Sequence, residues 1–290
     1  MNLIYPNIVP QNNLRLPDAL TVRHGPARLL GNFILEADKA ARAAGLRLRL
    51  RHDFDELHRI NQQEVKSGNW YPLIDMFNPE RNEIAPENAF WLSGENELGE
   101  IVTTFATRIY YWPDTNLEDE AVGMLFGRDE GQRCIITADA AKLISGVVMS
   151  SGAAWVRPDY RRRGLNQLLP RIAKAYAVSR WPVDWTFGFV TRVLVEKGVA
   201  SSSYGTGHYS YSVWFPDLPF GELVVAYTAV QEVYDDLAKY LTTDLSGSRD
   251  WKLASASASA AGAVTRQGWP RSLPYHIAQA CSARLVPCQL

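Results

Sequence analysis

The segment from Val147 to Tyr176 joins the pattern of a strand to the pattern of an amphipathic helix through a short basic turn. Residues 147–156 are apolar or small, which is typical of a strand. Beyond the turn, apolar residues recur at intervals of three and four, which predicts a helix over 165–180 with one face against a sheet. The members of that stripe are Leu165, Leu168, Leu169, Ile172, Ala173 and Tyr176. A strand that leads directly into such a helix favours an α/β fold.

Strand and helix patterns alternate on both sides of this segment. Leu46, Leu48 and Leu50 alternate with arginines, which predicts a strand with one wet face. Further strands are expected at 89–93, 100–112, 184–190, 209–215 and 223–230. Helices are expected at 33–44, from Asp53 to Gly68, at 70–77, near 138–144, at 192–198 and at 233–241. The alternation predicts an α/β sheet with crossover helices.

Composition changes divide the chain into three parts. Residues 1–45 are expected to form an extended, proline-containing arm over 1–26 and then a helix that ends at Gly45. Residues 46–245 hold the alternating pattern and are expected to form the main domain. Residues 246–290 begin with a Ser/Ala-rich run typical of a flexible linker and continue as a tail without a clear pattern, so we expect them to be peripheral. Residues 113–145 are irregular, with an acidic start at Glu118–Glu120.

The whole-chain properties exclude several classes of protein. The chain has 290 residues and a formal net charge of -1, which gives no overall attraction to nucleic acid or to anionic lipid. Its three cysteines, Cys134, Cys281 and Cys288, are too few for a disulfide framework and complete no metal-ligand pattern. No membrane span and no secretory signal are recognisable. We therefore expect a cytoplasmic protein that binds no metal, no nucleic acid and no membrane, and we leave a homodimer open.

The turn between the strand and the helix has the properties of an anion site. It reads Arg161-Arg162-Arg163-Gly164-Leu165-Asn166. The first N–H groups of a helix have no intrahelical partner, and the positive end of the helix dipole lies there. Gly164 has no Cβ to keep a ligand away from the backbone. The arginines add positive charge for a phosphate-rich ligand.

This turn resembles the signature of the GNAT superfamily of N-acetyltransferases, in which Arg or Gln is followed by two variable residues, Gly, one variable residue, and Gly or Ala. The match runs from Arg161 to Leu165 and fails at the last place, where Asn166 stands. The resemblance implies a mixed, mostly antiparallel sheet with crossover helices. It also implies an acetyl-coenzyme A co-substrate, with its pyrophosphate on the N–H groups of 162–166.

Further contacts and the acceptor follow from the same resemblance. The pantetheine arm is expected along Trp155-Val156, and Thr191 stands where the family often has an Asn that touches the cofactor. The acceptor is expected to be the amine of a small molecule or a peptide.

The chain departs from the family where the catalytic groups are usual. The strand 147–156 contains no Asp or Glu, and Val195 stands where the family usually has a Tyr. We expect the acid that protonates the leaving thiolate to come from Tyr204, Tyr209 or Tyr211. Packing of a half-buried strand is the alternative role of the last two, and Tyr204 is expected in a loop. Transfer is expected to be direct, without an acetyl-cysteine.

Three other functions are compatible with the sequence. The same fold could use a longer acyl thioester, as an N-acyl amino acid synthase or an acyl-homoserine lactone synthase. The missing carboxylate and tyrosine favour a coenzyme A-binding module without turnover. A nucleic-acid clamp built on Arg161–Arg163 has the least support, because no second basic stripe accompanies it.

Overall fold

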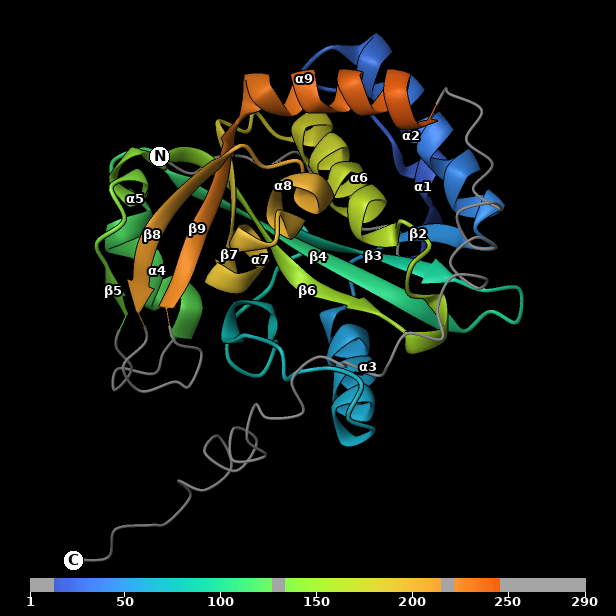
Figure 1. Ribbon diagram of the computed structural model, residues 1–290, viewed down its shortest axis with the longest axis horizontal. Coiled ribbons are helices and arrows are strands. Elements are labelled where there is room, and N and C mark those ends of the chain that lie inside the picture. The colour runs from blue at the N-terminus through green and yellow to red at the C-terminus, as the bar shows by residue number, and fades with distance from the viewer. Residues whose placement is uncertain (1–12, 127–133, 215–221, 246–290) are drawn as a thin grey trace, which may run out of the picture.

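The computed structural model describes residues 13–126, 134–214 and 222–245, which form one sheet with helices on both faces (Figure 1). Its strands are β1 (Leu14–Arg15), β2 (Arg47–Arg51), β3 (Ala89–Glu95), β4 (Ile101–Trp112), β5 (Ile135–Ile136), β6 (Gly146–Val156), β7 (Trp185–Thr191), β8 (His208–Trp214) and β9 (Glu222–Ala229). Its α-helices are α1 (Leu16–Ala19), α2 (Ala27–Ala43), α3 (Phe54–Lys66), α4 (Leu117–Phe126), α5 (Ala140–Leu143), α6 (Leu165–Arg180), α7 (Arg192–Glu196), α8 (Val199–Tyr204) and α9 (Val230–Tyr240). Short turns of other helix types are η1 (Asp75–Phe77), η2 (Pro158–Tyr160) and η3 (Leu241–Leu245).

The described strands follow the spatial order β1-β2-β3-β4-β6-β7-β9-β8-β5. All neighbouring pairs are antiparallel except β6 and β7, which are parallel. Parallel neighbours need a crossover, and α6 provides it. The predicted fold class, a mixed and mostly antiparallel sheet with crossover helices, is confirmed.

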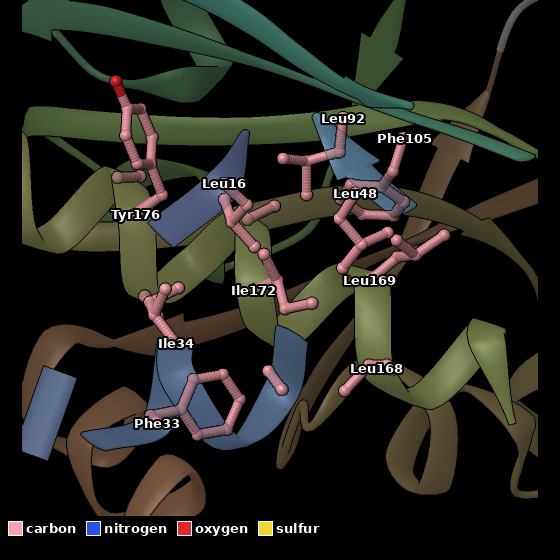
Figure 2. Packing of buried hydrophobic residues seen from close by; sticks show 14 of the residues in the cluster. Leu16, Phe33, Ile34, Leu48, Leu92, Phe105, Leu168, Leu169, Ile172 and Tyr176 are labelled. Atoms are coloured by element: carbon pink, nitrogen blue, oxygen red, sulfur yellow. The ribbon is translucent and has the colours of Figure 1, made fainter. Parts of the chain in front are cut away.

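Helices α2, α6 and α9 cover one face of the sheet (Figure 1). Leu48 of β2, Leu92 of β3 and Phe105 of β4 point from the sheet toward this layer, and Figure 2 shows them beside the apolar stripe of α6. Phe33 and Ile34 bring α2 against the other side of α6. The predicted stripe of α6 is buried throughout, but the helix is covered on more than the one face that the periodicity predicts.

Helices α3, α4 and α5 and the turn η1 cover the opposite face. Trp91 of β3 and Phe187 of β7 are buried there with Phe77 of η1. The sheet therefore lies between two apolar layers, which explains why so few of its residues are exposed.

Several local predictions are confirmed in detail. Asp53 caps α3 by accepting a hydrogen bond from the Glu56 N–H at 2.9 Å. Gly45 has a φ of 79° directly after α2, where a left-handed residue ends the helix. Two turn bonds close that end, from Gly45 N to Arg42 O and from Leu46 N to Ala41 O. Leu46, Leu48 and Leu50 are all buried, as their alternation with arginine predicts.

The structure differs from the sequence-based prediction in three segments. In the described part of the predicted extended arm, β1 pairs with β2 and Leu16 of α1 is buried in the same core as Leu48. Only the 3-10 turn η1 forms within the helix predicted over 70–77. The acidic residues Glu118–Glu120 lie in the first turn of α4, where carboxylates favour the helix dipole, so part of the segment 113–145 is regular. The predicted linker and tail, 246–290, lie outside the described residues.

The burial of α6 gives a stability prediction. Ile172 is fully buried between α6 and the sheet. Ile172→Ala should lower the free energy of unfolding by roughly 2–5 kcal/mol, because a cavity adds to the lost transfer energy. Urea denaturation measures this loss, with Leu98→Ala as the control because Leu98 is 83% exposed. Equal losses in the two variants would contradict this account of the core.

Candidate functional site

Strands β6 and β7 lie side by side only over their first residues. The paired positions are Val148 with Trp185, Met149 with Thr186, and Ser150 with Phe187. Beyond these positions β6 continues to Val156 along β4, and β7 continues to Thr191 along β9. The backbone edges of 151–156 and 188–191 are therefore not paired with each other. They can donate and accept hydrogen bonds to a ligand that lies between them.

A β-bulge changes the direction of β6 where the two strands separate. Thr104 lies opposite Trp155 but Ala106 lies opposite Gly152, so β6 has an extra residue here, and Ala153 has a φ of 47°. Two threonine hydroxyls of β4 bond the displaced backbone. Thr104 Oγ1 donates to Ala153 O at 2.9 Å, and Thr103 Oγ1 donates to Trp155 O at 2.6 Å.

The basic turn after β6 has an unusual backbone conformation. Arg162 has a φ of 66° and Gly164 has a φ of 72°, so left-handed residues occur twice within three positions. Such alternation turns successive N–H groups toward one point, which is the geometry of a backbone anion site. The N–H groups of residues 162–166 donate to no described residue. They lie at the N-terminus of α6, where the helix dipole adds positive charge.

The three predicted arginines have different environments. Arg163 donates to Ala44 O and Asp159 O at 3.2 Å each, and its guanidinium lies 4.1 Å from the centre of the Tyr160 ring. This side chain therefore holds the turn in place. Arg161 and Arg162 are exposed and pair with no carboxylate among the described residues, so their charges remain for a ligand.

The other predicted cofactor contacts divide into backbone and side-chain candidates. Leu165 is buried in the core, so only its N–H can contact a ligand. Trp155 is buried too and stacks on Trp70, with ring centres 5.5 Å apart. Val156 is half-buried at the end of β6. Asn166 is exposed and donates from Nδ2 to Ser203 Oγ at 2.6 Å, which ties the turn to α8.

Thr191 ends β7 and stands at the N-cap of α7. Its side chain makes no capping hydrogen bond and is exposed. The simple capping role, the alternative to a cofactor contact, is therefore not seen. The hydroxyl lies at the same end of the sheet as the basic turn, because β6 and β7 are parallel.

The three candidate tyrosines lie on α8 and β8. Tyr204 is the last residue of α8, which corrects its expected place in a loop: the turn begins one residue later, at the left-handed Gly205. Burial raises the pKa of the Tyr204 phenol, and its hydroxyl bonds no described residue. Tyr209 donates to Thr206 O at 2.9 Å, and Tyr211 is 41% exposed beside the Arg192 guanidinium. The Tyr209 proton is thus engaged, whereas the Tyr204 and Tyr211 hydroxyls donate to no described residue, and Tyr204 is the more buried of these two.

The sequence analysis missed a group of charged residues on the inner side of α6. Arg171 and Lys174 are buried, although the spacing alone places them on a wet face. Arg171 forms a two-bonded ion pair with Asp236 of α9, at 2.9 and 3.1 Å. Lys174 Nζ donates to Tyr204 O at 2.9 Å and to Gly205 O at 3.2 Å. The small residues beside these cations, Ala173, Ala175 and Ala177, are the sequence signal that other elements pack closely there.

Other side chains that could take part in chemistry have the following environments. Burial raises the pKa of the Cys134 thiol to about 12, so it is not a ready nucleophile. His208 Nε2 lies 2.6 Å from Glu232 Oε1. The described residues contain no group of three or more His, Cys, Asp or Glu placed to hold a metal ion. Within the described helices, none combines the length and apolar character that crossing a membrane demands.

Comparison with known proteins gives structural likenesses only. No family model matches the chain, and no curated protein matches it. The N-acyl amino acid synthase FeeM from uncultured soil microbes is 13% identical, with a TM-score of 0.39 over 69% of this chain and 99% of FeeM. NAA60 of Arabidopsis thaliana, solved with acetyl-CoA, is 11% identical, with a TM-score of 0.40 over 63% of this chain and 99% of its own.

A GNAT-family acetyltransferase from Streptococcus pneumoniae is also similar. It is 11% identical, with a TM-score of 0.36 over 63% of this chain and 99% of its own. These descriptions agree with the resemblance seen in the sequence. At such identities and TM-scores they carry no argument about this chain's activity, which depends on the geometry of the site.

The burial of Lys174 gives a prediction for the pH dependence of stability. Desolvation lowers the pKa of Lys174 to about 8, against about 10.4 for an unfolded lysine. Between these pH values the unfolded chain holds a proton that the folded chain lacks. The free energy of unfolding should therefore rise from about pH 8 to about pH 10.4, by up to roughly 3 kcal/mol. Below pH 8 this group gives no slope.

Urea denaturation of the wild type and of Lys174→Met, at several pH values in this window, measures the contribution. The variant removes the titrating group and shares all others, so the difference between the two curves isolates it. Two curves that stay parallel across the window would contradict the lowered pKa.

Proposed function

We propose that the chain is an acyl-coenzyme A-dependent acyltransferase of the GNAT type that transfers an acetyl group from acetyl-CoA to an amine. The observation that carries this proposal is the set of N–H groups of 162–166 that donate to no described residue and lie at the N-terminus of α6, directly after β6. A pyrophosphate offers the negative charge and the acceptor oxygens that such a surface can bind. Arg161 and Arg162 would add charge from the rim of the turn.

The separation of β6 from β7 supports a binding site for the pantetheine part of the cofactor. Pantetheine is a chain with two amide groups, and amides bond to open strand edges as another strand does. The unpaired edges of 151–156 and 188–191 begin beside the basic turn and run into the sheet. A cofactor whose pyrophosphate lies on the turn would therefore place its thioester near the bulge at Ala153.

The packing at the bulge favours a short acyl group. A Cβ at Gly152 would overlap the ring of Phe77, so η1 packs closely on β6 from the α3 side. A long acyl chain that ran from the bulge toward η1 would meet this ring. An acetyl donor therefore fits better than the long-chain donor of an N-acyl amino acid or acyl-homoserine lactone synthase.

The proposed chemistry is a direct transfer. The neutral amine nitrogen attacks the thioester carbonyl carbon, the C–S bond breaks, and the amine loses a proton to solvent or to a base. The leaving thiolate receives the phenol proton of Tyr204. The phenol is protonated at neutral pH, and because burial raises its pKa, the phenolate left after the transfer regains a proton from solvent. The acceptor is proposed to be the amine of a small molecule or a peptide.

Gly164→Val tests the cofactor site. The left-handed φ of Gly164 means that valine also strains the backbone, so a matched control is needed. Gly68→Val is suitable, because Gly68 has a φ of 71°, has open space around it, and follows α3 on the other face of the sheet. We expect Gly164→Val to weaken acetyl-CoA binding about tenfold or more and Gly68→Val to leave it unchanged. Titration calorimetry measures both.

Equal affinities of acetyl-CoA for the wild type and Gly164→Val would overturn the proposed site. Binding by the wild type without turnover of any amine in a broad panel would identify a coenzyme A-binding module instead.

The acid is tested by replacing each tyrosine singly with phenylalanine, which removes the phenol and preserves most packing. Tyr204→Phe should lower kcat roughly 10²-fold, with little change in acetyl-CoA affinity. Tyr209→Phe and Tyr211→Phe serve as controls and should keep most activity, because Tyr209 already donates to Thr206 O and Tyr211 is 41% exposed. Release of free coenzyme A with the best amine of the panel gives the rate. Full activity of Tyr204→Phe would exclude it as the acid.

A further inference from the structure

Helix α8 is too short to fix its own position. It has six residues, lies between the left-handed Gly198 and Gly205, and packs against α6 (Figure 1). An isolated helix of this length is marginal in water, and its last carbonyls have no intrahelical donors. Its placement must therefore come from groups outside it.

Two cations of α6 supply those donors. Arg171 Nη1 donates to Ser203 O at 3.2 Å and reaches Ser202 O at 3.5 Å. Lys174 Nζ donates to Tyr204 O at 2.9 Å and to Gly205 O at 3.2 Å. Cations at a helix C-terminus also interact favourably with its dipole.

The charge of this pair is balanced from α9. Asp236 accepts two hydrogen bonds from Arg171, and a Cβ at Gly205 would overlap the Asp236 carboxylate. Glu232, which pairs with His208, is the second carboxylate whose negative charge favours the protonated form of Lys174. A continuous series of ion pairs and hydrogen bonds thus links α9, through α6, to the end of α8. A buried arrangement of this kind gives little net stability, which leaves positioning as its physical benefit.

We propose that Arg171 and Lys174 are positioning residues for catalysis: by binding the carbonyls at the end of α8, they hold Tyr204 at a fixed place relative to the cofactor turn. This rests on the proposed function, in which Tyr204 is the acid. The turn and both cations belong to the same helix, since α6 begins at the turn and carries Arg171 and Lys174. The hydrogen bond from Asn166 to Ser203 joins α8 to the turn directly.

The test is Lys174→Met, which keeps the length and burial of the side chain and removes both hydrogen bonds. We expect amide hydrogen exchange of residues 199–205 to become about tenfold faster or more. We also expect kcat to fall about tenfold or more, while calorimetry gives the same acetyl-CoA affinity within about twofold. Arg180→Met is the matched control: it removes a cation from the same helix that contacts Tyr176 and Trp181 and does not reach α8.

A double variant separates positioning from a purely structural effect. In the Tyr204→Phe background, Lys174→Met should change kcat less than about twofold, because the group that it positions is already absent. Equal losses from Lys174→Met in both backgrounds, or an unchanged exchange rate of α8, would overturn the proposal.

Two further measurements keep the outcomes distinct. Arg171→Lys retains a charge for Asp236 and loses the planar fork that reaches Ser202 O and Ser203 O, so it tests the other cation's contact with the end of α8 if Lys174→Met does not fold. Full activity of Tyr204→Phe would refute the proposed acid, and with it the catalytic part of this inference. Amide hydrogen exchange of α8 would still report whether Lys174 holds the end of this helix.

Discussion

The packing of α6 between the sheet and helices α2 and α9 determines where every part of the candidate site lies. Its apolar stripe, with Ile172 and Tyr176, fixes the helix on the sheet, and Phe33 and Ile34 of α2 cover its other side. Because the helix is held on several sides, its N-terminus cannot move away from the end of β6. The unpaired N–H groups of the basic turn therefore stay aimed at one place, which an anion site needs.

The second constraint is the separation of β6 from β7. If these parallel strands continued together, their backbone N–H and C=O groups would pair with each other and none would be left for a ligand. Here the pairing ends at Ser150 and Phe187, and the bulge at Ala153 turns β6 away. Hydroxyls of Thr103 and Thr104 bond the displaced carbonyls, so the irregular backbone does not leave them unsatisfied. The open strand edges and the turn lie at the same end of the sheet.

Buried charge at the junction of α6, α8 and α9 has a cost that the apolar core must offset. Replacing a buried ion pair such as Arg171–Asp236 with apolar side chains is often neutral or stabilising. The position of this ion pair next to the end of α8 agrees with a role in fixing the place of α8 more than in stabilising the fold. Lys174, with its lowered pKa, shows the same conflict between burial and charge.

The sequence by itself determined the elements whose signals are local. Alternation of leucine and arginine predicted β2, the intervals of three and four predicted α6, and Asp53 and Gly45 marked helix ends, because periodicity and capping depend on neighbours within a few residues. The candidate anion site could be proposed from the sequence for the same reason, since Gly164 adjoins the helix that it starts.

Only the tertiary structure decided the features that depend on distant segments. Leu16 joins the core because β1 pairs with β2, and the carbonyl of Tyr204 at the end of α8 accepts a hydrogen bond from Lys174 of α6. Arg171 and Lys174 follow a spacing that predicts a wet face, and they are buried because α8 and α9 cover that face. The partners of these side chains lie some 30 to 65 residues further along the chain, and no local pattern encodes a contact across that separation.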